Sequence, residues 1–283
     1  MRLRTLLLAL ALICTAQPLG AVTPSVHHEM HPSQTGLVFE EVRFPSVHDS
    51  VSIPGWWFEG AAGSPVLVMC SRGSGTMADL LPSVREFASR GFAVLTFDYR
   101  DFGPGTAGAV DSLQNIVFAS RWVDDAEGAF RYAHARAPGR FVFAWGQDLG
   151  GPVALAVAVR DHRLVDALAV EGLFRTAQEQ IYYNGTSQVP GVPERHRSLV
   201  LGTDEPVSTV PMLQAPLFVI VARKDEVTPF TMTMETTRRS LSRIDRWILP
   251  LGGHDGLELT PGYFDKLSDW FKQLMKVLPT PSS

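Results

Sequence analysis

An aspartate stands in this sequence where a nucleophilic serine would be expected. The stretch GQDLGG, residues 146–151, follows the apolar run RFVFAW and precedes the Ala/Val-rich run PVALAVAVR. A strand, a sharp turn and a helix in this order form a nucleophile elbow, whose sequence pattern is G-x-S-x-G. Gly146 and Gly150 would let the strand and the helix approach closely. The central residue, Asp148, is therefore either a nucleophile or the mark of a site that has lost its serine.

Asp148 could attack carbon without the help of a base. A serine hydroxyl needs a neighbouring group to take its proton, whereas an aspartate has an ordinary pKa near 3.9 and is ionised at neutral pH. The N-terminus of the following helix would favour the charged form further. Such a carboxylate can displace a leaving group from a saturated carbon and form an alkyl ester. Attack on a carboxylic ester would give an anhydride instead, which is a poor route.

Further polar residues follow other strand-like runs. Asp225 comes after LFVIVAR, and His254 comes shortly after DRWILPL. The Gly/Ser-rich loop 70–75 could aim backbone N–H groups at a developing oxyanion, and we expect one donor at Ser74 and a second at Leu149. Functional groups in parallel sheets gather at the carboxyl ends of the strands, so we expect these residues to lie together.

The strand-like and helix-like runs must position these groups. Two or three strand-like runs come first, after which strand and helix alternate. This order predicts a mostly parallel eight-stranded sheet with helices on both faces. Helix-like runs cover 78–91, 116–135, 153–160, 230–241 and 263–275. Strand-like runs cover 38–44, 51–60, 65–71, 92–99, 141–146, 165–172, 217–225 and 245–251.

One long interruption divides the later runs. Residues 174–214, about 40 positions without clear periodicity, separate two strand-like runs. A gap of that length in a compact domain is usually a lid or a binding loop. We therefore predict a single domain over 38–283 with a small lid at about 174–214, in which Tyr182 and Tyr183 are candidates for contact with a substrate.

Taken in order, these motifs resemble those of the α/β-hydrolase superfamily over about residues 38–275. In that superfamily the nucleophile, the acid and the histidine base follow one another along the chain in this order. The resemblance implies the α/β-hydrolase fold, with Asp148 as nucleophile, Asp225 as acid and His254 as base. Its haloalkane dehalogenase and epoxide hydrolase branches use such an aspartate. In those branches the histidine activates the water that hydrolyses the alkyl ester.

The sequence departs from the aspartate branches at several positions. Leu149 stands where those branches commonly have tryptophan, and residues 72–75 read RGSG in place of H-G-x-P. The interruption is shorter than their lid, and no halide-binding tryptophan pair can be assigned. Tyr182 and Tyr183 could polarise an epoxide oxygen. The frame around the elbow looks more like the serine esterase, lipase and peptidase branch.

A second hypothesis is a non-catalytic member of the superfamily that binds a small ligand. Aspartate is a favoured helix N-cap residue, so Asp148 could cap the helix that follows it. Glu171, at the end of the strand-like run before Asp225, is an alternative acid. Both hypotheses imply a small-molecule partner, and nothing in the sequence implies a metal or an organic cofactor.

The N-terminus has the features of a secretory signal peptide. Two arginines precede an apolar run that is too short to span a bilayer, and small residues follow. We expect a signal peptide over 1–21, cleaved after Ala16 or Ala21, and a secreted or periplasmic protein. Residues 22–37 are expected to be a flexible lead-in whose histidines are solvated rather than bound to a metal.

The composition bounds the remaining possibilities. The 283 residues are 45% hydrophobic and 19% charged, which is ordinary for a globular protein. The net charge of −4 and the lack of basic clusters argue against nucleic acid as a partner. No later run is apolar for long enough to span a membrane. After signal cleavage only Cys70 would remain, which excludes an intramolecular disulfide.

Overall fold

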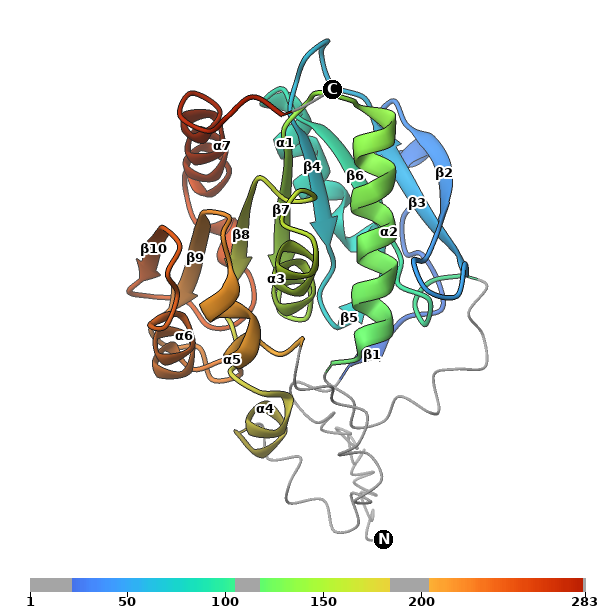
Figure 1. Cartoon of the computed structure of the whole chain (residues 1–283). Helices are drawn as coiled ribbons and strands as arrows, with labels where there is room; N and C mark the ends of the chain where they lie inside the picture. Colours follow the sequence, from blue (N-terminus) through green and yellow to red (C-terminus); the bar gives the residue numbers. More distant parts are fainter. Residues whose placement is uncertain (1–21, 105–117, 184–203, 282–283) are drawn as a thin grey trace, which may run out of the picture.

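A mixed eight-stranded sheet forms the centre of the protein in its computed structural model, which describes residues 22–104, 118–183 and 204–281 (Figure 1). The spatial order of the strands is β10-β9-β8-β7-β4-β6-β3-β2. The six strands from β10 to β6 are parallel, and β3 and β2 are antiparallel additions at one edge. The strands are β2 (Glu40–Pro45), β3 (Ser52–Phe58), β4 (Val66–Cys70), β6 (Ala93–Phe97), β7 (Val142–Gln147), β8 (Ala167–Glu171), β9 (Leu217–Ala222) and β10 (Ile244–Leu249).

The burial of the strands follows from their sequences. Strands β4, β6, β7, β8 and β9 are buried along their whole length, as expected for nearly continuous apolar runs covered on both faces. Strand β2, at the edge, alternates between exposed and buried residues. The predicted eight-stranded, mostly parallel sheet is thus confirmed.

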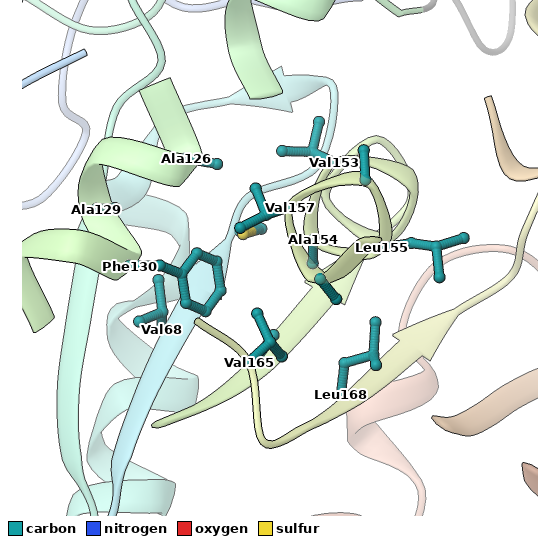
Figure 2. Close-up of a cluster of buried hydrophobic side chains, with 14 of the residues drawn as sticks. Val68, Ala126, Ala129, Phe130, Val153, Ala154, Leu155, Val157, Val165 and Leu168 are labelled. Atoms are coloured by element: carbon teal, nitrogen blue, oxygen red, sulfur yellow. The ribbon is translucent and has the colours of Figure 1, made fainter. Parts of the chain in front are cut away.

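Helices cover both faces of the sheet. Helix α1 (Leu81–Ser89) and helix α7 (Tyr263–Leu274) pack with one apolar cluster. Helix α2 (Ser120–Arg136) and helix α3 (Gly150–Arg160) pack with the other, which Figure 2 shows around Phe130, Val157 and Leu168. Helix α3 is buried almost all round because its small apolar residues lie between the sheet and α2. Helix α6 (Phe230–Thr237) carries Met232 against this second cluster.

The chain reverses its direction across the sheet at β4. Strand β6 lies on one side of β4, and the next sheet strand along the chain, β7, lies on the other. Ligands of open α/β sheets bind at such a switch point, outside the carboxyl ends of the strands. The loops that follow β4 and β7 therefore meet at the position where a site is expected.

The ends of the predicted lid are rooted in the core. Helix α4 (Ala177–Tyr183) follows Phe174, and α5 (Pro206–Thr209) with the 3₁₀ turn η6 (Val210–Met212) precedes β9. Phe174, Ala177, Val210 and Leu213 are all buried in the cluster beneath α2 and α3. Residues 184–203, the middle of the predicted lid, lie outside the described residues.

The segment expected as a flexible lead-in is folded against the domain instead. Strand β1 (Thr23–Pro24) pairs in parallel with β5 (Ser74–Gly75), and a 3₁₀ turn η1 (Pro32–Gln34) follows. Val22 is buried, and His28 lies against the buried Asp98. An apolar residue and a hydrogen-bond partner for a buried carboxylate hold this segment in place. The predicted signal peptide, residues 1–21, lies outside the described residues.

Candidate active site

Asp148 lies at a strained turn between β7 and α3. Its φ of +47° is in the left-handed region that residues other than glycine rarely adopt. The flanking glycines are required by space, because a Cβ on Gly146 would lie 2.3 Å from the Gly150 carbonyl oxygen. A Cβ on Gly150 would lie 2.0 Å from the carbonyl oxygen of Cys70. The geometry is that of the predicted nucleophile elbow.

The Asp148 carboxylate does not cap helix α3. The cap residue is Leu149, and no side chain supplies a cap hydrogen bond. Within the described residues, the hydrogen bond that Asp148 accepts on its side chain comes from the N–H of Gly73, at 3.4 Å. The side chain is 28% exposed, so it is open to a reactant. Because a helix cap normally has extended rather than left-handed backbone, capping gives no reason for the strain.

His254 connects Asp148 with Asp225. Its Nδ1 atom lies 3.1 Å from Oδ2 of Asp225, and its Nε2 atom lies 3.7 Å from Oδ1 of Asp148. Asp225 is buried, and its Oδ1 atom accepts hydrogen bonds from the N–H groups of Val227 (2.9 Å) and Thr228 (2.7 Å). These bonds fix the carboxylate that orients the imidazole. The three residues matched by sequence order thus come together in space.

We call Asp148, His254 and Asp225 the relay residues. The negative charges of the two aspartates keep His254 protonated. Burial alone would lower the pKa of His254. The hydrogen bond to Asp225 and the negative charges of Asp148 and Asp225 outweigh burial and raise the pKa to about 9. At neutral pH the imidazole is therefore a cation between two carboxylates. In a serine hydrolase the corresponding histidine must be neutral to take the serine proton.

The loop after β4 supplies a backbone donor to the Asp148 side chain, and the expected oxyanion donors at Ser74 and Leu149 stay a prediction. The N–H that donates to Asp148 belongs to Gly73 and not to Ser74 or Leu149. Ser74 lies in β5, where its backbone pairs with β1, and Leu149 is the cap residue before α3, next to Asp148. Arg72 donates to Asp255, beside His254, at 2.8 Å. This ion pair joins the loop after β4 to the loop that carries the histidine.

Tyr182 and Tyr183 are the last two residues of α4. Figure 1 shows this helix at the end of the sheet to which the parallel strands point. The positions of the two side chains lie outside what the structure describes. Among the described residues, no group of three or more His, Cys, Asp or Glu side chains could hold a metal ion.

A buried polar network lies beside the elbow, and the sequence did not predict it. Glu171 accepts hydrogen bonds from Tyr263 and, at 3.1 Å, from the Gln147 side chain. The Tyr263 hydroxyl also accepts from Trp145 at 2.9 Å. Burial raises the pKa of Glu171 to about 7. Because Glu171 is bound here and not to His254, it is not the acid of the relay; no sequence motif marks this pairing.

A separate cavity of about 820 Å³ lies between α1 and the corner formed by α7 and the 3₁₀ turn η7 (Leu257–Leu259). Its wall includes residues of the loop 71–76 and Gln147, but none of the three relay residues. In the described part of the chain, no helix is long and apolar enough to cross a bilayer.

Known proteins resemble this chain in sequence and in fold. No family model matches the sequence. The protein bem46 of Schizosaccharomyces pombe is 21% identical over 269 residues, which cover 89% of this chain and 82% of bem46. The lysophosphatidylserine lipase ABHD12 of Gallus gallus is 27% identical over 191 residues, or 62% of this chain and 47% of the lipase.

A solved structure extends the likeness to the whole domain. The esterase Pf2001 of Pyrococcus furiosus superposes with a TM-score of 0.71 at 15% identity, covering 89% of this chain and 98% of the esterase. Likeness at this level of identity concerns the fold, and it agrees with the strand order and the elbow geometry described above. The chain therefore has the α/β-hydrolase fold that the order of its motifs predicted.

Proposed function

We propose that this protein is an α/β-hydrolase-type enzyme that uses Asp148 as a covalent nucleophile. The observation that carries the proposal is the strained Asp148 carboxylate, which is partly exposed, does not cap its helix and faces an intact His254–Asp225 pair. Backbone strain of this kind costs of order 1–3 kcal/mol and persists mostly where function requires it. A decayed site would have no reason to keep it.

The first chemical step forms an alkyl ester. One oxygen of the Asp148 carboxylate attacks a saturated carbon of the substrate, and the bond from that carbon to its leaving atom breaks. If the leaving atom is oxygen, it takes the proton from Nε2 of His254. The step thus converts an anionic Asp148 and a cationic His254 into a neutral ester and a neutral imidazole. Charge and protons balance without any other group.

The second step hydrolyses that ester. Because the ester carries no charge, the attraction that held the proton on His254 is weakened, and the imidazole can act as a base. His254 takes a proton from water, whose oxygen attacks the carbonyl carbon of Asp148, and the Gly73 N–H stabilises the oxyanion. The alcohol leaves with the proton of the new carboxyl group. Asp148 is again a carboxylate and His254 again a cation.

The resting charge of His254 favours a substrate whose leaving atom needs a proton. A strained cyclic ether such as an epoxide opens to an alkoxide that the imidazolium neutralises. A halide leaves as a stable anion, so His254 would first have to lose its proton to solvent before it could activate water. The names of ABHD12 and Pf2001 point to carboxylic esters. For this chain an ester substrate is disfavoured, since attack by a carboxylate would give an anhydride.

The covalent step can be tested with heavy-oxygen water and an epoxide such as styrene oxide. In a single turnover the product should carry no label, because its new oxygen comes from Asp148. After many turnovers the peptide that contains Asp148 should carry the label. The Asp148→Asn variant is the matched control and should show neither turnover nor label. A labelled first-turnover product with an unlabelled peptide would reduce Asp148 to a general base.

A second variant separates a working scaffold from a site that only binds ligands. The Asp148→Ser protein should gain activity on an activated acetate ester. The serine would have His254 as its base once the negative charge at position 148 is gone, and oxyanion donors contribute roughly 10²–10³ in rate each. The Asp148→Ser/His254→Ala protein is the control. If the two folded variants are equally slow, a non-catalytic ligand-binding protein is favoured.

We propose in addition that the chain is exported and acts as a secreted or periplasmic protein. The charged start, the short apolar run and the small residues within 1–21 support this proposal. N-terminal sequencing of the exported protein should find Gln17 or Val22 as the first residue, and recovery of Met1 on that protein would contradict it.

A further inference from the structure

Residues 22–28, which we call the N-terminal strap, run along the same end of the sheet as the candidate active site. Figure 1 places β1 next to β5 at the end to which the parallel strands point. In β1, Thr23 is paired with Ser74 and Pro24 with Gly75. The N–H of Ser25 also donates to the carbonyl of Gly75 at 3.2 Å. The strap thus extends the loop 70–75 by a second strand.

Two further contacts fasten the strap to the loop that follows β6. The N–H of Gly103 donates to the carbonyl of Ser25 at 2.8 Å. Nε2 of His28 lies 2.6 Å from Oδ2 of Asp98, whose Oδ1 accepts from the N–H of Met77 at 2.7 Å. Asp98 is fully buried and His28 is 16% exposed. The strap is therefore anchored both to the loop that carries the Gly73 donor and to the loop after β6.

The start of the strap lies next to the nucleophile. Val22 is 6% exposed and belongs to the main apolar cluster. A Cβ built on Gly73 would lie 3.4 Å from Cγ2 of Val22, 3.5 Å from Oδ2 of Asp148 and 3.5 Å from Cβ of Leu149. Val22 and the reacting carboxylate therefore line the same small space beside Gly73.

We infer that the N-terminal strap is a wall of the active site and that Val22 is a positioning residue, which holds Gly73 so that its N–H faces Asp148. The inference rests on the proposed function only in treating Gly73 as the oxyanion donor. Two-residue strand pairs are too short to be stable alone. The apolar contact of Val22 holds the end of the strap that lies nearest Gly73, so its loss should loosen the loop there without unfolding the sheet.

Amide hydrogen exchange tests whether Val22 holds the loop that carries Gly73, independently of any activity. In Val22→Ser, the peptide that contains residues 71–76 should exchange about tenfold faster than in the unmodified chain. The peptides from β4 and β7 should be unchanged. Val38→Ser is the matched control, because Val38 is 88% exposed and lies outside the strap. Val22→Ile should restore slow exchange, and Val22→Ala would replace Val22→Ser if the latter does not fold.

Kinetics test the catalytic part. With the epoxide of the labelling experiment, Val22→Ser should lower kcat about tenfold and leave KM within about twofold, since a backbone oxyanion donor acts mainly on the transition state. Unchanged exchange over 71–76, or faster exchange over every peptide, would overturn the inference. Faster loop exchange with an unchanged kcat would overturn the positioning role. If the unmodified chain turns over nothing, the proposed function fails and the exchange result alone decides whether the strap holds the loop.

Discussion

A single residue, Asp148, changes the charges that surround His254 in this site. A serine at position 148 would leave His254 as a base between a hydroxyl and Asp225. Asp148 instead adds a second carboxylate, 3.7 Å from the imidazole, and stabilises the cation. The resting site then holds an acid where a serine hydrolase holds a base. Esterification of Asp148 would remove that carboxylate's charge, so the substrate itself would convert His254 from acid to base.

The protonation of His254 gives a direct prediction. In nuclear magnetic resonance, the imidazole of His254 should titrate near pH 9 rather than near its ordinary 6.5. Asp148→Asn should lower this pKa, because one of the charges that raise it is gone. The rate at limiting substrate should fall above about pH 9 as the imidazolium loses its proton. A titration near 6.5 in the unmodified protein would contradict the proposed acid role.

The same shift links the site to stability. Because the pKa of His254 is higher in the folded than in the unfolded chain, its stabilising contribution is fully present below about pH 6.5. That contribution is lost as the pH rises from there through about 9. Denaturant unfolding at several pH values should show this loss, and Asp148→Asn should reduce it.

Sequence order identified the three relay residues because each follows its own strand, and strand ends in a parallel sheet converge. It could not identify Gly73, since which N–H faces Asp148 depends on the path of the loop and not on a side chain. It also could not identify Val22, which is near Asp148 only through β1. The Glu171–Tyr263 pair joins residues 92 positions apart and has no motif.

At the scale of elements, the length of each strand decided whether the sequence could predict it. The eight strands of the main sheet were all found, because five to seven residues of apolar or alternating sequence give a clear signal. Strands β1 and β5 have two residues each, which is too few for any periodicity. Helix α6 ends at Thr237, although its pattern continued to 241. Helix ends depend on contacts that the pattern does not contain.

A buried ion pair joins the loop after β6 to helix α2, and its loss should be costly. Arg100 is 14% exposed and contacts the fully buried carboxylate of Asp125 at 2.6 Å. Arg100→Met would leave the Asp125 carboxylate buried without its charged partner, which typically costs about 3–5 kcal/mol. Denaturant unfolding should therefore show a large fall in stability. Arg163→Met is the control. The Arg163 side chain, which pairs with Asp161, is exposed, so its loss should change stability little.

At the scale of the whole molecule, the fold is held by its core and not by covalent links. Both faces of the sheet are covered, and the two clusters meet the sheet along its full length. The described residues contain one cysteine, Cys70. Its thiol is free and buried at the end of β4. Each fully buried Val, Leu or Phe side chain contributes roughly 1.5–3 kcal/mol. Stability should therefore be the same with and without reductant.

Cys70 can report both on this core and on the processing of the N-terminus. Burial raises the pKa of its thiol from 9.0 to about 12, so the reactive thiolate should be roughly a thousandfold rarer than in an ordinary cysteine. Alkylation of the native protein should be slow and should follow global unfolding, because the side chain lies at the centre of the sheet. In denaturant, mass spectrometry should find one alkylated thiol if residues 1–21 were removed, and two if Cys14 is still present. Rapid alkylation under native conditions would show that the loop after β4 opens locally, at the place where the N-terminal strap is proposed to hold it closed.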